Sequence, residues 1–168
     1  MKRLIILFAL MISATGAMGA QNNKVRAIFM FQLTRYSSWE VEAGAKSFVV
    51  TVVGADDVAE EFENVTKGKT IQGLPINVIK SSSTRNLPKS DVIYLAPSFA
   101  DRTRSVISDQ YGNKTLVIGG REGMCQNGAQ VSLTDDGTKV GFEWSRHNIE
   151  KGGVKISPKI LSMGKELN

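Results

Sequence analysis

Hydrophobic residues recur at helical spacing between residues 24 and 39. The apolar positions in this stretch are Val25, Ile28, Phe29, Leu33 and Tyr36, with Ala27, Met30 and Phe31 beside them. Positions three and four residues apart lie on one face of a helix, and the additional apolar residues widen that face. We therefore predict a helix that is buried on more than one side and that ends in the polar stretch after Ser37.

Short apolar runs farther along the chain predict β-strands. They cover residues 48–53, 76–79, 92–95, 116–118, 131–134 and 140–144. The first run, FVVTVV, is rich in β-branched residues and has no polar alternation, which is typical of a strand buried on both faces. The last two runs flank Asp135-Asp136-Gly137, which predicts a hairpin because Asp-Gly suits the positive φ of a tight turn.

Two helices are predicted between these strands. Asp56-Asp57 begins a short acidic helix that runs to about Asn64, and residues 97–110 form a second one. Acidic residues favour helix amino termini, which explains the aspartates. They also lie where a strand meets a helix in an α/β sheet, a place where ligands often bind, so a ligand site is the alternative interpretation.

Capping residues mark predicted helix boundaries near the end of the chain. Ser145 is suited to cap a helix that runs to about Lys151 and stops at Gly152-Gly153. Ser157-Pro158 is suited to start a last helix through Leu167. Strands and helices alternate over most of the chain and a hairpin follows. This order predicts an α/β fold: a single three-layer α/β domain over residues 21–168, with a mixed, largely parallel sheet and a C-terminal hairpin.

The first twenty residues have the order of a secretory signal peptide. Lys2 and Arg3 precede an apolar run from Leu4 to about Ala14, and small residues follow. The run is too short to span a bilayer core of about 30 Å as a helix. We therefore expect residues 1–20 to be removed on secretion, so that the mature chain begins near Gln21.

Charge and cysteine content narrow the function classes. The chain has 168 residues and a formal charge of +5, without a long basic block, which does not fit a nucleic-acid-binding protein. Cys125 is the only cysteine, so no disulfide can form within the chain. In an oxidising compartment such a thiol is either buried and inert or available for an intermolecular disulfide.

No catalytic constellation stands out, so the sequence does not predict an enzyme, a metal site or a cofactor. His147 is the only histidine, and neither a paired-histidine zinc site nor a G-x-S-x-G nucleophile motif is present. Gly68-Lys69-Thr70 resembles the end of a phosphate-binding loop, but Glu63 stands where that motif requires glycine.

The residues that could bind a partner are large aromatic and charged side chains near predicted element ends. A tryptophan there is either core with a solvated indole N–H or an interface anchor. Arg35 could pair with a carboxylate inside the domain or present its charge at the surface. The candidate partner-binding residues are Arg35, Trp39, Trp144, Arg146, Glu150 and Lys151.

Taken together, these pieces resemble the YfiR family of secreted bacterial proteins, also called DUF4154. The resemblance covers essentially the whole mature chain and rests on the order and spacing of short motifs. They are Lys24, Ala27, Phe31, Arg35-Tyr36 and Trp39; Val50 to Gly54; Gly68-Lys69, Ile71, Gly73, Pro75-Ile76 and Val78; Asp91 to Leu95; Thr115 to Ile118; and Phe142, Ser145, Gly153-Val154, Ser157 and Ile160-Leu161.

The resemblance implies a regulatory role in the periplasm. A dimer of such a protein binds the extracytoplasmic domain of a membrane-bound diguanylate cyclase and represses it, which affects cyclic di-GMP and biofilm. Better-known members carry paired cysteines, whereas this chain has only Cys125, so redox control does not carry over. The alternative function is a periplasmic small-molecule or envelope-fragment binding module that serves a sensor or transport system.

Overall fold

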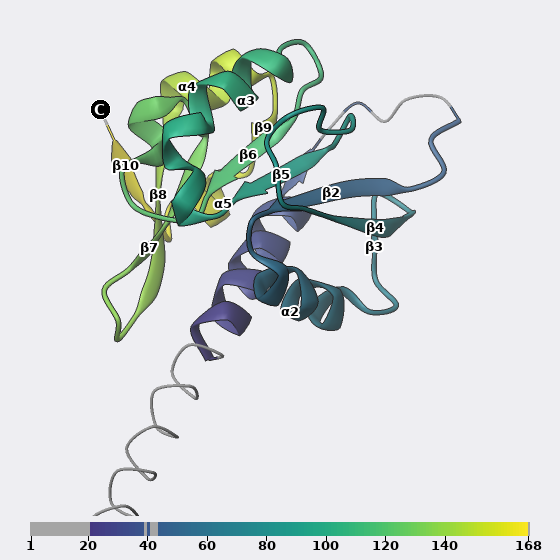
Figure 1. Cartoon of the computed structure of the whole chain (residues 1–168), viewed down its shortest axis with the longest axis horizontal. Helices are drawn as coiled ribbons and strands as arrows, with labels where there is room; N and C mark the ends of the chain where they lie inside the picture. Colours follow the sequence, from purple (N-terminus) through teal and green to yellow (C-terminus); the bar gives the residue numbers. More distant parts are fainter. Residues whose placement is uncertain (1–20, 39, 41–43, 168) are drawn as a thin grey trace, which may run out of the picture.

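The computed structural model describes residues 21–38, 40 and 44–167. Its centre is an eight-stranded sheet with the strand order β10-β8-β7-β6-β5-β2-β4-β3 (Figure 1). In that order the strands are β10 (Lys165–Leu167), β8 (Val140–Ser145), β7 (Val131–Asp135), β6 (Leu116–Gly119), β5 (Val92–Leu95), β2 (Phe48–Val53), β4 (Leu74–Ser81) and β3 (Thr70–Ile71).

The sheet is mixed and largely parallel, which confirms the predicted fold class. Strands β7, β6, β5, β2 and β4 all run in the same direction. The hairpin of β7 and β8 is antiparallel, and so is the pairing of β3 with β4, while β10 lies parallel to β8. A second, small sheet joins β1 (Ser37–Ser38) to β9 (Lys155–Ile156).

Helical segments cover both faces of the large sheet, which gives the three predicted layers (Figure 1). One face carries the N-terminal helix, helical at residues 21–35, together with α2 (Asp56–Thr66). The opposite face carries α3 (Thr103–Asp109). Helix α4 (Arg146–Gly152) lies next to α3 in Figure 1, and its Ile149 packs against the core of the first face. The shorter helical segments are η1 (Pro97–Arg102), η2 (Met124–Asn127) and α5 (Pro158–Leu161).

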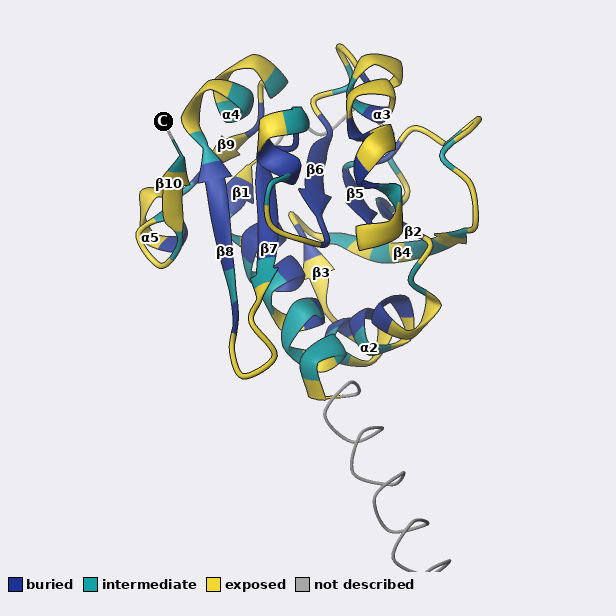
Figure 2. Ribbon diagram, turned by 60° about the vertical axis from the view of Figure 1, so that its left-hand side comes forward, coloured by how far each residue is buried: buried dark blue, intermediate teal, exposed yellow. Residues whose placement is uncertain are grey.

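Each face of the sheet has its own hydrophobic core, and β5 contributes to both. Val92 and Tyr94 belong to the core under the N-terminal helix and α2, whereas Ile93 and Leu95 belong to the core under η1 and α3. Side chains alternate between the two faces of a strand, so a strand buried on both sides needs a continuous apolar sequence. The central strands are accordingly buried along their length (Figure 2).

The N-terminal helix is buried through a different arc from the one predicted. Its fully buried side chains are Ala27, Met30, Leu33 and Thr34, with Phe31 nearly so. Ile28, predicted to be apolar core, is 39% exposed, and Phe29 is only partly buried. Apolar residues surround most of this helix, so periodicity alone placed the centre of the buried face incorrectly. The helix ends before Ser37 as expected, and Ser37–Ser38 then forms β1.

The last predicted helix is much shorter than expected. It begins at Pro158, with Ser157 Oγ accepting a hydrogen bond from Lys159 N, but ends at Leu161. The chain then turns at Gly164, where an added Cβ would lie 2.2 Å from Cε2 of the buried Phe142 ring. This close approach of backbone to ring lets residues 165–167 pair with β8 as β10.

Among the described residues, none of the helices is both long and apolar enough to cross a membrane. The predicted signal peptide, residues 1–20, lies outside the described part of the chain.

Candidate functional site

The segment that follows β8 forms a groove at the surface. Ser145 caps α4 by accepting a hydrogen bond from Asn148 N, and Gly153, with φ of 71°, ends the helix, as predicted. The chain then enters β9 and α5, which leaves a groove of about 400 Å³. Its lining is apolar apart from three charged residues; the residues are Trp144, Arg146, Ile149, Glu150, Gly153, Val154, Lys155, Ile156, Pro158 and Leu161. We call it the α4–β9 groove.

Trp144 lies at the base of this groove and is 7% exposed. Its indole N–H donates to the Leu161 carbonyl oxygen over 3.1 Å, and the Arg146 guanidinium lies 5.5 Å from the ring centre. The indole N–H is therefore bonded within the protein rather than to solvent. Trp144 shapes the groove as a buried residue, which favours the core interpretation over that of an exposed anchor.

Arg146 connects α4 to the last strand. Its guanidinium donates two hydrogen bonds to the Glu166 carboxylate, at 2.8 and 3.2 Å, and Glu166 raises the pKa of Arg146. Reversal of the Arg146 charge would set two carboxylates side by side and loosen β10. A substitution at this position therefore changes the fold locally as well as the groove surface.

The other candidate residues do not all meet at the groove. Glu150 lines it, whereas Lys151, from the same helix, lines a separate cavity of about 80 Å³ with Gln130. Arg35 is exposed near the end of the N-terminal helix, with no ion pair to another described residue. Trp39 lies outside the described residues. Lys155, which the sequence reasoning did not single out, also lines the groove.

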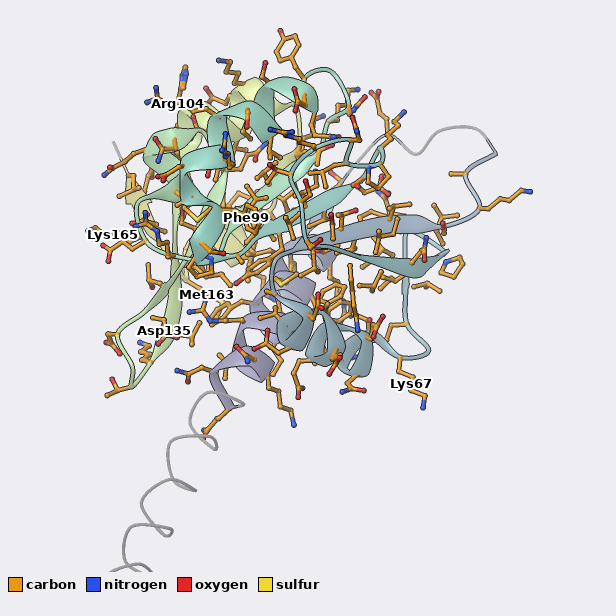
Figure 3. All side chains as sticks on the ribbon, viewed as in Figure 1. Lys67, Phe99, Arg104, Asp135, Met163 and Lys165 are labelled. Atoms are coloured by element: carbon orange, nitrogen blue, oxygen red, sulfur yellow. The ribbon has the colours of Figure 1, made fainter. Side chains whose placement is uncertain are left out.

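The carboxyl edge of the parallel strands is closed by the chain itself. In sheets of this type ligands bind where the strand order reverses, here between β2 and β5. The Phe99 ring packs so tightly on Gly54 that an added Cβ would lie 2.3 Å from it. Phe99 therefore covers the end of β2, beside the point of reversal (Figure 3).

Arg26 fills the next position along this edge. Its guanidinium donates to the Gly120 carbonyl oxygen at 2.6 Å and to the Asp135 carboxylate at 2.8 Å, and lies 3.5 Å from the Tyr94 hydroxyl. Burial raises the pKa of Tyr94, and Arg26 opposes that rise. The N-terminal helix thus reaches across the ends of β5, β6 and β7 (Figure 3).

The aspartates at the start of α2 belong to the same helix contact. Asp57 accepts hydrogen bonds from the Asn23 side chain at 2.5 Å and from Val58 N at 2.9 Å. These bonds favour the helix-start interpretation of Asp56-Asp57 over a ligand site. Among the described residues, no group of three or more histidine, cysteine, aspartate or glutamate side chains is placed to hold a metal ion.

Cys125 is a buried residue of η2. Its Sγ accepts a hydrogen bond from Ser132 Oγ at 3.1 Å and lies 3.7 Å from the Glu143 carbonyl oxygen. Burial is the main cause that raises the pKa of this thiol to about 12. A thiol reacts as its thiolate, so these surroundings favour the inert interpretation over an intermolecular disulfide.

We expect iodoacetamide at pH 8 to leave Cys125 of the folded protein unmodified, since the thiol is protonated and shielded from solvent. The same reagent should alkylate it fully in denaturant, as mass spectrometry of the intact protein would show. Complete alkylation within minutes under native conditions would mean that η2 opens readily and that the thiol is accessible.

Two solved structures share the fold. One is a conserved domain protein from Vibrio cholerae O1 biovar El Tor, with a TM-score of 0.55 and 17% identity over 71% of this chain and 54% of that one. The other is an ABC domain from Streptococcus pneumonia in complex with L-Trp, with a TM-score of 0.54 and 13% identity over 72% and 55%. The chain therefore spans about half the length of each.

No curated protein sequence matches the chain. The sequence profile of the YfiR/HmsC-like family, DUF4154, matches residues 23–165, nearly the whole described part. The match includes the hairpin, α4, β9 and α5, which together build the groove. The protein belongs to the YfiR/HmsC-like family.

Proposed function

We propose that this protein is a non-enzymatic periplasmic repressor that binds the extracytoplasmic domain of a membrane-bound diguanylate cyclase and holds the cyclase inactive. Its family is one of periplasmic regulators in cyclic di-GMP signalling. A protein of this kind acts through contact, so its working part is a binding surface. Affinity for the partner would then control cyclic di-GMP and biofilm formation, and by the same resemblance the repressor would work as a homodimer.

The α4–β9 groove is the observation that carries this proposal. It combines an apolar base with both charge signs, from Glu150 and Lys155. Interfaces bury a hydrophobic centre inside a polar rim, and arginine and aromatic residues are enriched in them. Ser145 and Gly153 fix both ends of α4, so the groove is held in shape before a partner arrives.

A small-molecule binding module is the second candidate. The observation that favours it is the related fold of the Streptococcus domain, whose structure is a complex with L-Trp. In the present chain Phe99 and Arg26 occupy the sheet edge at which such folds bind ligands. We therefore place contact with a protein partner first.

The groove can be tested through two exposed residues whose charges are reversed together. The double variant Glu150→Lys with Lys155→Glu keeps the net charge. It is expected to weaken binding to the purified periplasmic domain of a cyclase from the same organism at least tenfold. Partner charges that pair with Glu150 and Lys155 would then face charges of their own sign. Lys151→Glu, on the same helix but outside the groove, is the matched control and should bind like the unaltered protein.

Cellular cyclic di-GMP provides the functional measurement. Loss of the gene should raise the cyclic di-GMP level, and expression of the unaltered protein should bring it back to the original level. The double variant should fail to do so, although its melting temperature is unchanged. If deletion leaves cyclic di-GMP constant, the proposed function is wrong. If the double variant represses as well as the unaltered protein, the partner binds elsewhere on the surface.

A further inference from the structure

Among the described residues, no strand pairs with the outer edge of β4 over most of its length. On its inner side β4 pairs with β2 from Ile76 to Ser81. On its outer side β3 pairs only with Leu74 and Pro75. An uncovered edge presents free backbone donors and acceptors and can accept an additional strand.

The pairing with β2 defines which backbone groups face outward. The Ser81 carbonyl oxygen accepts a hydrogen bond from Gly54 N, so the Ser81 backbone groups face β2. In a parallel ladder the N–H and C=O of one residue point to the same side, and alternate residues point to opposite sides. The peptide groups of Ile76, Val78 and Lys80 therefore point away from the sheet.

The side chains of these same three residues lie on the face that α2 covers. Lys80 Nζ lies 3.4 Å from a Glu60 oxygen and 3.7 Å from a Glu63 oxygen. Ile76 and Val78 pack against the core on that face. A strand added at this edge would thus place alternate side chains beside the outer surface of α2.

That surface is acidic. The charged residues of α2 are all aspartate or glutamate, and its last turn contains no basic residue. Lys80 is shared between two carboxylates whose side chains are 67% and 47% exposed, so negative charge remains uncompensated. Lys69, near the end of α2, is instead bonded to the Val65 carbonyl oxygen and stacked on Phe31.

There is also room beside the strand. A groove of about 540 Å³ separates residues Pro75–Val78 of β4 from the chain that leads from α2 into β3. Its charged lining residues are Glu63 beside β4 and Lys67 and Lys69 on the chain that follows α2, where Lys67 projects beyond the helix (Figure 3). The outer edge of β4 thus has outward-facing backbone groups, open space beside them and carboxylates of α2 nearby.

We propose that the edge of β4 binds an extended basic segment of a partner protein by strand addition, with alternate lysine or arginine side chains facing Glu60 and Glu63. A second copy of this chain would fit less well, because antiparallel pairing through the same edge would bring two acidic α2 helices together on one face. The proposal is independent of the α4–β9 groove and of the repression assigned to it.

The test uses a fluorescent ten-residue peptide in which lysine alternates with threonine or valine. At low salt it should bind the protein, and hydrogen exchange of the Ile76, Val78 and Lys80 amides should slow at least tenfold. A peptide of the same sequence, N-methylated at alternate positions, keeps every charge but loses the donors needed for pairing, and should bind at least tenfold more weakly. An alternating glutamate peptide should not bind.

Variants of the protein separate the contribution of charge to peptide binding from that of backbone pairing. Glu60→Gln with Glu63→Gln should weaken binding of the lysine peptide about fivefold or more. Val78→Pro removes an outward-facing N–H, a change that edge strands tolerate, and also replaces a side chain that packs against the core. It should abolish binding without loss of β-sheet signal. Equal binding of the methylated peptide, unchanged amide exchange, or no binding at millimolar peptide would each overturn the proposal.

Discussion

Phe62→Ala is expected to lower the free energy of unfolding by about 3–5 kcal/mol, the range for removal of a large buried aromatic side chain. Phe62 lies on α2, is fully buried and belongs to the core between that helix and the sheet. Domains of this size are stable by only about 5–15 kcal/mol, so the variant should lose a large share of its stability. A urea titration followed by circular dichroism measures the change.

Phe29→Ala is the matched control on the N-terminal helix. Phe29 is only partly buried and meets the Phe142 ring edge to face, with 5.6 Å between ring centres. We expect Phe29→Ala to lower the free energy of unfolding clearly less than Phe62→Ala does. Equal losses at both positions would mean that Phe29 is a full core residue, as its helical spacing suggested.

Arg26→Ala should give the largest effect outside the hydrophobic cores, a loss of about 2–3 kcal/mol, because hydrogen bonds to charged groups are stronger than neutral ones. The Arg26 side chain is 12% exposed and bonds both Gly120 and Asp135, at the ends of two strands. Arg26→Lys, which keeps the charge but not the forked geometry, should recover only part of the loss.

Acid titration separates the Asp135 contribution. The Gly137 backbone N–H, and then Arg26, lower the pKa of Asp135 in the folded protein. A carboxyl with a lowered pKa stabilises the fold above its ordinary pKa near 4, and that stability is lost as the pH falls through the lowered value. Arg26→Ala should therefore lose less stability than the unaltered protein between pH 5 and pH 3. An identical pH dependence in both proteins would show that the Gly137 N–H alone lowers the pKa of Asp135.

Much of the sheet could be predicted because burial on both faces leaves a local signal. The run at 48–53 is continuous and β-branched, and its predicted bounds match β2. The two-residue strands β1, β3 and β9 carry no such signal, since each exists only through its partner strand. The predicted end of the last helix, Leu167, was wrong for a similar reason. The contact of Gly164 with Phe142, at which the chain turns, joins residues far apart in sequence.

The groove was partly predictable. Ser145 and Gly153 are local cap signals, and they correctly placed α4 between them. The pairing of Arg146 with Glu166 depends on β10, a segment for which the sequence predicts a helix. Arg26 gave no signal of its own, because a single arginine in an amphipathic helix usually lies at the surface.

The contacts of the N-terminal helix also set an order for folding. Arg26 bonds Asp135 across 109 positions of the chain, and Asn22 reaches the same carboxylate across 113. Such distant contacts form slowly, because a long loop must close before they stabilise anything. We therefore expect these contacts to form only once the β7–β8 hairpin is in place. In a chain that crosses a membrane amino terminus first, the bonds from Asn22 and Arg26 would be among the last to form, after most of the domain has emerged.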